Sequence, residues 1–208
     1  MQMQTSSDQT ELVQRKPILS ARQVAITVIF GAIAGAFELL QITIPGYLPG
    51  VNFSLSGIWL SLATMIGGPI VGVIVAFVDA ITGQVGIIGW PGFAIHVLIL
   101  AALYPRVYRI ENPTRRLVGY LIITMIALFF QYWWWIALYS FVLQIIPFRA
   151  QLVLQFGYAY WVYLAIYFLI PALVLARAPQ FVAPEWRWPW QREESETATE
   201  TETASRPT

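Results

Sequence analysis

Two carboxylic acids and one imidazole stand within otherwise apolar stretches of this chain: Glu38, Asp79 and His96. A charged side chain at the centre of a bilayer helix costs about 2.5–3.5 kcal/mol on insertion scales, so such residues usually face a cavity or a partner. We therefore expect these three residues to line a ligand site. In a purely structural alternative, Glu38 reaches interfacial water near a helix end and Asp79 pairs with His96.

Aromatic and amide side chains recur every four residues in two later segments. Gln131, Trp135 and Tyr139 share one helical face of the run FFQYWWWIALY (129–139). A second face, at the same predicted depth, carries Gln151, Gln155 and Tyr158. Aromatic walls with a few placed amides suit a flat heteroaromatic ligand. Trp and Tyr are also enriched at membrane interfaces, so we assign most of the others, Trp133 and Trp134 included, to lipid contact or packing.

Two connecting segments rich in Gly and Pro add polar groups near the same site. Asn52 lies in TIPGYLPGVNFS (43–54), and Gln84 and Trp90 lie in GQVGIIGWPGF (83–93). We expect these three residues to contact the ligand, although each segment is also consistent with a plain turn. Arg149 is interpreted as an ordinary loop cation.

The composition excludes most other chemistries. The chain has 208 residues, of which 58% are hydrophobic and 11% charged, and its mean hydropathy is +0.64; soluble domains carry about 25% charged residues. A net charge of +1 gives no basic excess for binding nucleic acid. Without Cys and with a single His, disulfides, thiolate or His-rich metal sites and a cysteine nucleophile are excluded. We therefore expect neither an enzyme nor a bound cofactor or metal.

Continuous apolar runs without period-2 alternation predict membrane-spanning helices, because helices satisfy their own backbone groups in lipid. Gly and Pro separate the runs, and the spans are expected at about 24–44, 53–66, 69–87, 91–104, 117–145 and 151–175. The predicted fold is all-α, a six-transmembrane-helix bundle over 18–177. A polar segment (1–17) precedes it, and an interfacial segment with a disordered Glu/Thr-rich tail (178–208) follows it.

The distribution of Lys and Arg predicts the orientation of this bundle. With six spans and a cytoplasmic N-terminus, eleven of the twelve basic residues fall on the cytoplasmic side, and only Arg149 lies outside. We therefore expect a multi-pass protein of the cell membrane with both termini in the cytoplasm.

Two stretches resemble the substrate-binding S component of energy-coupling factor (ECF) vitamin transporters. ARQVAITVIFGAIAGAFELL (21–40) has a basic edge followed by small residues. SLSGIWLSLATMIGGPIVGVIVAFVDAITG (54–83) resembles the family's helix pair joined by a Gly-Pro turn, with an acid near the end of the second helix. The resemblance covers roughly 18–177. The family's first helix usually carries Ala-x-x-x-Ala near its cytoplasmic end, whereas here Val28 stands four residues before Ala32.

The resemblance implies a division of labour. The S component would bind a vitamin or related micronutrient from outside, and a transmembrane T component with two ATPase subunits would supply energy. It implies that 43–54 is a lid and that Gly31, Ala32, Gly35 and Ala36 form the docking face for the T component; the alternative is packing within the bundle. The chain has no G-x-x-x-x-G-K-[ST] run of its own. Glu38 and the Trp-rich face favour a nitrogen heterocycle with cationic character.

Two other classes of function remain open at this point. One is a membrane scaffold or assembly protein that uses its Gly/Ala face and aromatic residues for helix contacts only. The other is an intramembrane enzyme that uses Glu38, Asp79 and His96 as acid and base groups, although their spacing matches no recognised catalytic motif.

Overall fold

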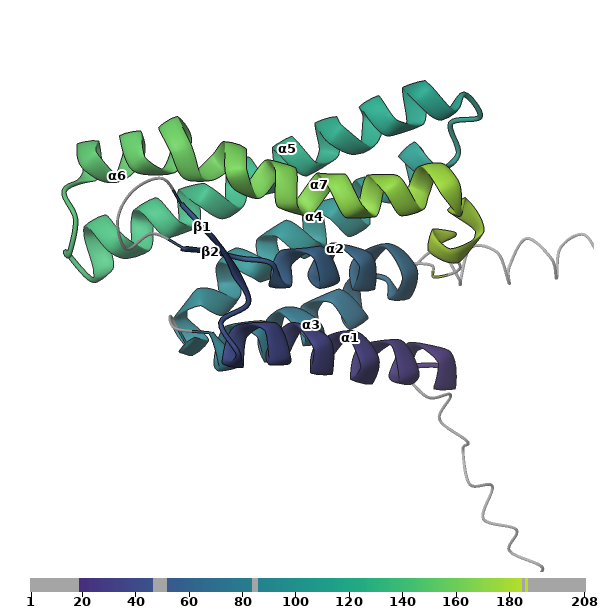
Figure 1. The fold of residues 1–208 in the computed structure, drawn as a ribbon, viewed down its shortest axis with the longest axis horizontal. Coiled ribbons are helices and arrows are strands. Elements are labelled where there is room, and N and C mark those ends of the chain that lie inside the picture. The colour runs from purple at the N-terminus through teal and green to yellow at the C-terminus, as the bar shows by residue number, and fades with distance from the viewer. Residues whose placement is uncertain (1–18, 47–51, 84–85, 185, 187–208) are drawn as a thin grey trace, which may run out of the picture.

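The protein is an all-α bundle with one small β-hairpin (Figure 1). The computed structural model describes residues 19–46, 52–83, 86–184 and 186. Its α-helices are α1 (Ala21–Leu39), α2 (Ser56–Gly67), α3 (Pro69–Thr82), α4 (Trp90–Tyr108), α5 (Pro113–Ala137), α6 (Phe148–Leu154) and α7 (Tyr160–Arg177). The hairpin pairs β1 (Thr43–Pro45) with β2 (Asn52–Ser54) in antiparallel register, with Ile44 opposite Phe53. Two 3₁₀ turns, η1 (Gly86–Gly89) and η4 (Pro179–Val182), and two π-helical segments, η2 (Leu138–Val142) and η3 (Gln155–Ala159), complete the described chain.

Four helical segments of the described chain are long and apolar enough to cross a membrane: Ala21–Leu39, Gly86–Tyr108, Pro113–Val142 and Phe148–Arg177. The all-α expectation is confirmed, and the chain has the features of a membrane protein. Helices α2 and α3 are shorter, with 12 and 14 residues. At 1.5 Å per residue each spans roughly 20 Å, less than the ~30 Å hydrocarbon core. Length and composition alone therefore identify four spanning candidates.

Local sequence signals explain where the helices begin. Ser20 and Gln23 form a capping box at the start of α1, and the Asn112 side chain accepts a hydrogen bond from the backbone N–H of Arg115 at the start of α5. Between α2 and α3, Gly68 has φ of +87°, a conformation that strongly favours glycine. Pro69 then occupies the first turn of α3, where its missing N–H leaves no hydrogen bond unmade.

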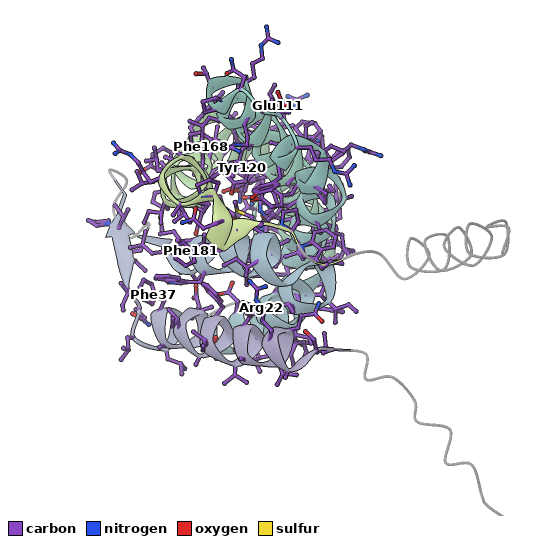
Figure 2. The ribbon with its side chains drawn as sticks, turned by 90° about the vertical axis from the view of Figure 1, so that its right-hand side faces the viewer. Arg22, Phe37, Glu111, Tyr120, Phe168 and Phe181 are labelled. Carbon is purple, nitrogen blue, oxygen red and sulfur yellow. The ribbon has the colours of Figure 1, made fainter. Side chains whose placement is uncertain are left out.

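The chain reverses direction at each connection, so the bundle has two distinct ends (Figure 1). The hairpin, the last turn of α1 and the start of α6 lie at one end. The opposite end carries the beginning of α1, the α2–α3 turn, the α4–α5 connection and η4, and Figure 2 views the molecule from this side, with Arg22, Glu111 and Phe181 labelled. We call these the hairpin end and the opposite end.

Tyrosine side chains tie α5 to α7 in the interior. The Tyr120 ring stacks on Phe168 with centroids 5.7 Å apart (Figure 2), and its hydroxyl donates to the Tyr167 carbonyl oxygen at 3.2 Å. Tyr160 donates in the same way to the Met125 carbonyl oxygen at 2.9 Å. The outer surface is apolar instead: Val28 is 64% exposed and Leu169 62%. An apolar surface around a polar-bonded interior fits a lipid environment.

Three details differ from the sequence-based expectation. The 43–54 connection is a hairpin rather than a plain loop, although 47–51 lie outside the described residues. Helix α4 continues through Pro105 to Tyr108, past the break that Pro105 predicted. The last two long segments are interrupted by π-helical turns, which propensity does not reveal.

The small residues of α1 do not form one face. Gly31 and Gly35 are buried against α3, where a Cβ on Gly35 would lie 3.3 Å from Val78 Cγ1. Ala32 and Ala36, each about 100° around the helix from the preceding glycine, are exposed. The predicted docking set is therefore divided, because the two glycines take part in packing within the bundle.

Gly57 allows α2 to approach α7 closely, since a Cβ there would lie 2.2 Å from the Tyr167 ring. We expect Gly57→Ala to destabilise the protein by about 1–3 kcal/mol through overpacking. The measurement is the melting temperature in detergent. Gly157→Ala is the matched control, because a Cβ there would lie 3.8 Å from Val153 Cγ1, an ordinary contact distance; an equal melting temperature for both variants would contradict the close approach.

Candidate functional site

A cavity of about 630 Å³ lies at the hairpin end of the bundle. Its walls come from the end of α1, the hairpin, the start of α2, the end of α3, the start of α4, the end of α5, and the segments α6, η3 and α7. Gln41 and Asn52 line it and are exposed, so the cavity reaches the surface beside the hairpin. Its size is within the range typical of small-molecule sites.

Two serines of the hairpin and of α2 bind the carboxylate of Glu38. Ser56 Oγ donates to Glu38 Oε1 at 2.7 Å, and Ser54 Oγ donates to the same oxygen. The Ser56 backbone N–H donates in turn to Ser54 Oγ at 3.2 Å. These bonds join the last turn of α1 to β2 and the first turn of α2, and so fix the hairpin over the cavity.

Asp79 lacks comparable partners. Its side chain is 1% exposed, lines the cavity, and neither carboxyl oxygen has a hydrogen-bond partner. The Ser56 hydroxyl lies close enough to Asp79 to interact with it, but in this structure the Ser54 and Ser56 hydroxyls donate to Glu38. The two carboxyl groups also interact electrostatically. The site therefore holds one hydrogen-bonded carboxyl group and one whose acceptor capacity is free.

Aromatic rings form much of the remaining cavity wall. Trp135 stacks on Tyr139 with centroids 6.1 Å apart and 28° between the planes, and Phe93 meets Trp135 edge-on at 5.5 Å. On the other side, Phe53 of the hairpin packs edge-on against Tyr158 and Tyr163. The rings leave flat surfaces on which a planar ligand can stack.

Two buried glutamines complete the polar lining. Gln131 on α5 is 4% exposed and Gln151 on α6 is 1% exposed, and the Oε1 atom of each lacks a hydrogen-bond partner. Both residues line the cavity. Below them Tyr167 closes the floor, and beyond it the interior is filled by apolar core residues such as Leu60 and Leu100.

The structure brings most of the predicted binding residues to this one cavity: Glu38, Asn52, Asp79, Gln131, Trp135, Tyr139, Gln155 and Tyr158. Gln84 lies outside the described residues. Trp90 and His96 are not among the lining residues. The Trp90 indole N–H donates instead to the Val73 carbonyl oxygen at 3.4 Å and its ring packs against Phe77. His96 is fully buried behind Tyr167, with ring centroids 4.6 Å apart, and neither ring nitrogen has a partner.

Sequence reasoning missed several lining residues: Phe53, Ser54, Ser56, Phe93, Tyr132, Tyr163 and Tyr167. A signal existed for two of them, because Tyr163 and Tyr167 continue at intervals of four the series begun by Gln151 and Gln155. The serines carried no such signal, since their role depends on the hairpin folding back onto α1.

The described part of the chain contains no group of three or more His, Asp or Glu side chains that could hold a metal ion. Comparisons with models of protein families, with curated proteins and with solved structures find no match. The class that the fold and the site define is therefore a helical membrane protein with a polar and aromatic cavity.

Removing both hydroxyl donors tests the serine–Glu38 cluster. We expect the double variant Ser54→Ala/Ser56→Ala to lose about 1.5–3 kcal/mol of stability per hydrogen bond, because these bonds go to a carboxylate. In a Glu38→Gln background the same double change is expected to cost much less. Unfolding measured in detergent gives both costs, and equal costs in the two backgrounds would contradict the cluster.

Proposed function

We propose that this protein is the membrane-embedded binding subunit of an uptake system for a vitamin or related micronutrient, with energy supplied by a separate transmembrane T component and two ATPase subunits. The resemblance of 21–40 and 54–83 to the S components of ECF transporters led to this proposal. On this view the protein itself is not an enzyme, and its task is to bind the cargo.

The observation that carries the proposal is the cavity with its buried, unpartnered Asp79. A buried polar group without a partner lowers stability. A scaffold protein gains nothing from such a group, whereas a binding protein regains the cost when its ligand is bound. The aromatic walls and the amides of Gln131 and Gln151 give the same cavity stacking surfaces and directional contacts.

We further propose six spans in the cell membrane, with both termini in the cytoplasm. The short helices α2 and α3 would each cross as part of the bundle, and α6, η3 and α7 would form the last crossing. Six of the seven Lys and Arg residues in the described chain belong to the end opposite the cavity: Arg22, Arg106, Arg109, Arg115, Arg116 and Arg177. Under the positive-inside rule this distribution supports a cavity that opens outward.

The test of binding is a thermal-shift panel on the purified protein with cationic, neutral and anionic vitamins, combined with mass spectrometry of any compound that copurifies. A ligand bound only by the folded state raises the melting temperature by mass action. We expect one class of compounds to do so and the others not. A complete absence of stabilisation and of a copurified compound would overturn the proposal in favour of a scaffold.

Substitutions of two tryptophans on α5 test where the ligand binds. We expect Trp135→Ala to weaken binding of the stabilising compound by roughly tenfold or more, which corresponds to about 1.4 kcal/mol of lost aromatic contact. Trp133→Ala is the matched control, because Trp133 is 40% exposed and does not line the cavity. Titration of both variants gives the affinities, and equal losses would place the site elsewhere.

The exposed side of α1 is the docking face that we propose for the T component. Ala32 and Ala36 are exposed and one turn apart, so a partner helix can approach closely there. We expect Ala36→Leu to reduce copurification of the T component and energised uptake while ligand binding by the isolated protein is retained. Val118→Leu, on the exposed side of α5, is the control. Undiminished copurification with Ala36→Leu would refute this face.

A further inference from the structure

The unpartnered polar atoms of the cavity wall share one chemical property. They are Asp79 Oδ1 and Oδ2, Gln131 Oε1 and Gln151 Oε1, and all are hydrogen-bond acceptors, while the amide of each glutamine also carries N–H donors. Each belongs to a side chain that is at least 96% buried. Buried polar atoms are normally hydrogen-bonded, so a ligand that satisfies them has to supply hydrogen-bond donors.

The charge of the lining points in the same direction. Its acidic side chains are Glu38 and Asp79, and no Lys, Arg or His lines the cavity among the described residues. The internal segments outside the described chain, 47–51 and 84–85, contain no basic residue either. An anionic ligand would meet two carboxyl groups in a site of low dielectric constant without a compensating cation.

The two carboxyl groups are not equivalent. Glu38 already accepts hydrogen bonds from Ser54 and Ser56, so much of its acceptor capacity is used within the protein. Asp79 has both oxygens free and is more deeply buried. The strongest contact with a cation is therefore expected at Asp79, with Glu38 adding attraction at longer range.

We propose that the cargo of this cavity is a flat organic cation that carries N–H donors, such as an amidinium, a guanidinium or a protonated aminoheterocycle. The charged N–H group binds the Asp79 carboxylate, further N–H donors reach Gln131 and Gln151, and the ring stacks among Phe93, Trp135 and Tyr139. This inference rests on the proposed function and adds the substrate class. Compounds whose main handle is a carboxylate are excluded from the cavity.

Three nearly isosteric probes isolate charge: benzamidine (+1), benzamide (0) and benzoate (−1). We expect the wild-type protein in detergent to bind benzamidine roughly tenfold or more tightly than benzamide, and benzoate more weakly than either, because the ring is constant and only the charged head changes. Phenyltrimethylammonium, a cation without N–H donors, is expected to bind more weakly than benzamidine. Titration monitored by ligand-observed NMR gives the order directly.

The outcomes separate this inference from the proposed function. Benzoate binding as well as benzamidine, or equal binding of benzamidine and benzamide, overturns the cation class. Equal binding of benzamidine and phenyltrimethylammonium overturns the requirement for N–H donors. An anionic vitamin that binds in the thermal-shift panel overturns this inference while the uptake function stands. Absence of binding by every probe and every vitamin overturns both.

A substitution at the unpartnered carboxyl group provides a second readout. We expect Asp79→Asn to weaken benzamidine binding by roughly tenfold or more and benzamide binding by much less. In the ligand-free protein the same variant is expected to raise the melting temperature, because a buried unpartnered carboxyl group is removed. Glu111→Gln, on the exposed α4–α5 connection, is the control. Unchanged benzamidine affinity in Asp79→Asn overturns the assignment of Asp79, and the probe series on the wild-type protein remains decisive if the variant does not fold.

Discussion

The arrangement of this protein depends on a carboxyl group that is buried without a partner. Asp79 lies in the last turn of α3 after ten apolar residues, and the Ser54 and Ser56 hydroxyls donate to Glu38. In an interior of low dielectric constant such a group costs stability. The rest of the hairpin end is built around it, because the hairpin, α1, α5 and α6 contribute walls of the cavity that Asp79 lines.

A cavity in an apolar bundle also needs a helix that keeps one face toward it over many residues. Residues 151, 155, 159, 163 and 167 all line the cavity at intervals of four. In a regular α-helix each such step advances by about 40°, so the face would turn away within a few steps. The π-helical segment η3 widens the turn in the middle of this series and reduces that drift. The segment η2, which ends the α5 segment, contains Tyr139, so both π-helical segments lie at the cavity wall.

Much of the fold and of the site follows from local sequence signals. Apolar runs and Gly-Pro breaks predicted the helices, and the rarity of ionisable residues within those runs singled out Glu38 and Asp79. What the sequence could not give depends on contacts between distant segments. His96 and Asp79 look equivalent as isolated polar residues, but the path of α4 turns His96 behind Tyr167. Gly31 and Ala32 look like one docking stripe, but α3 packs against the glycines and leaves Ala32 exposed. The hydrogen bonds from Ser54 and Ser56 to Glu38 form only because the hairpin folds back onto α1.

The two ends of the bundle are built on different principles, and this difference explains how one end can be open. At the opposite end two side chains bind the end of α2: Gln23 donates to the Gly67 carbonyl oxygen at 3.0 Å and the Trp186 indole N–H donates to the Met65 carbonyl oxygen at 3.4 Å. The Tyr104 hydroxyl donates to the Val182 carbonyl oxygen of η4 at 2.7 Å. The ring of Trp186 also occupies the space that a side chain on Gly68 would need. Backbone carbonyls of the turn and of η4 are thus satisfied within the protein at this end, while acceptors at the hairpin end are left for a solute. Unsatisfied acceptors at one end lower the stability of the bundle, so the helices have to be held in place at the other end. The hydrogen bonds to the end of α2 hold the start of α3, the helix that carries Asp79.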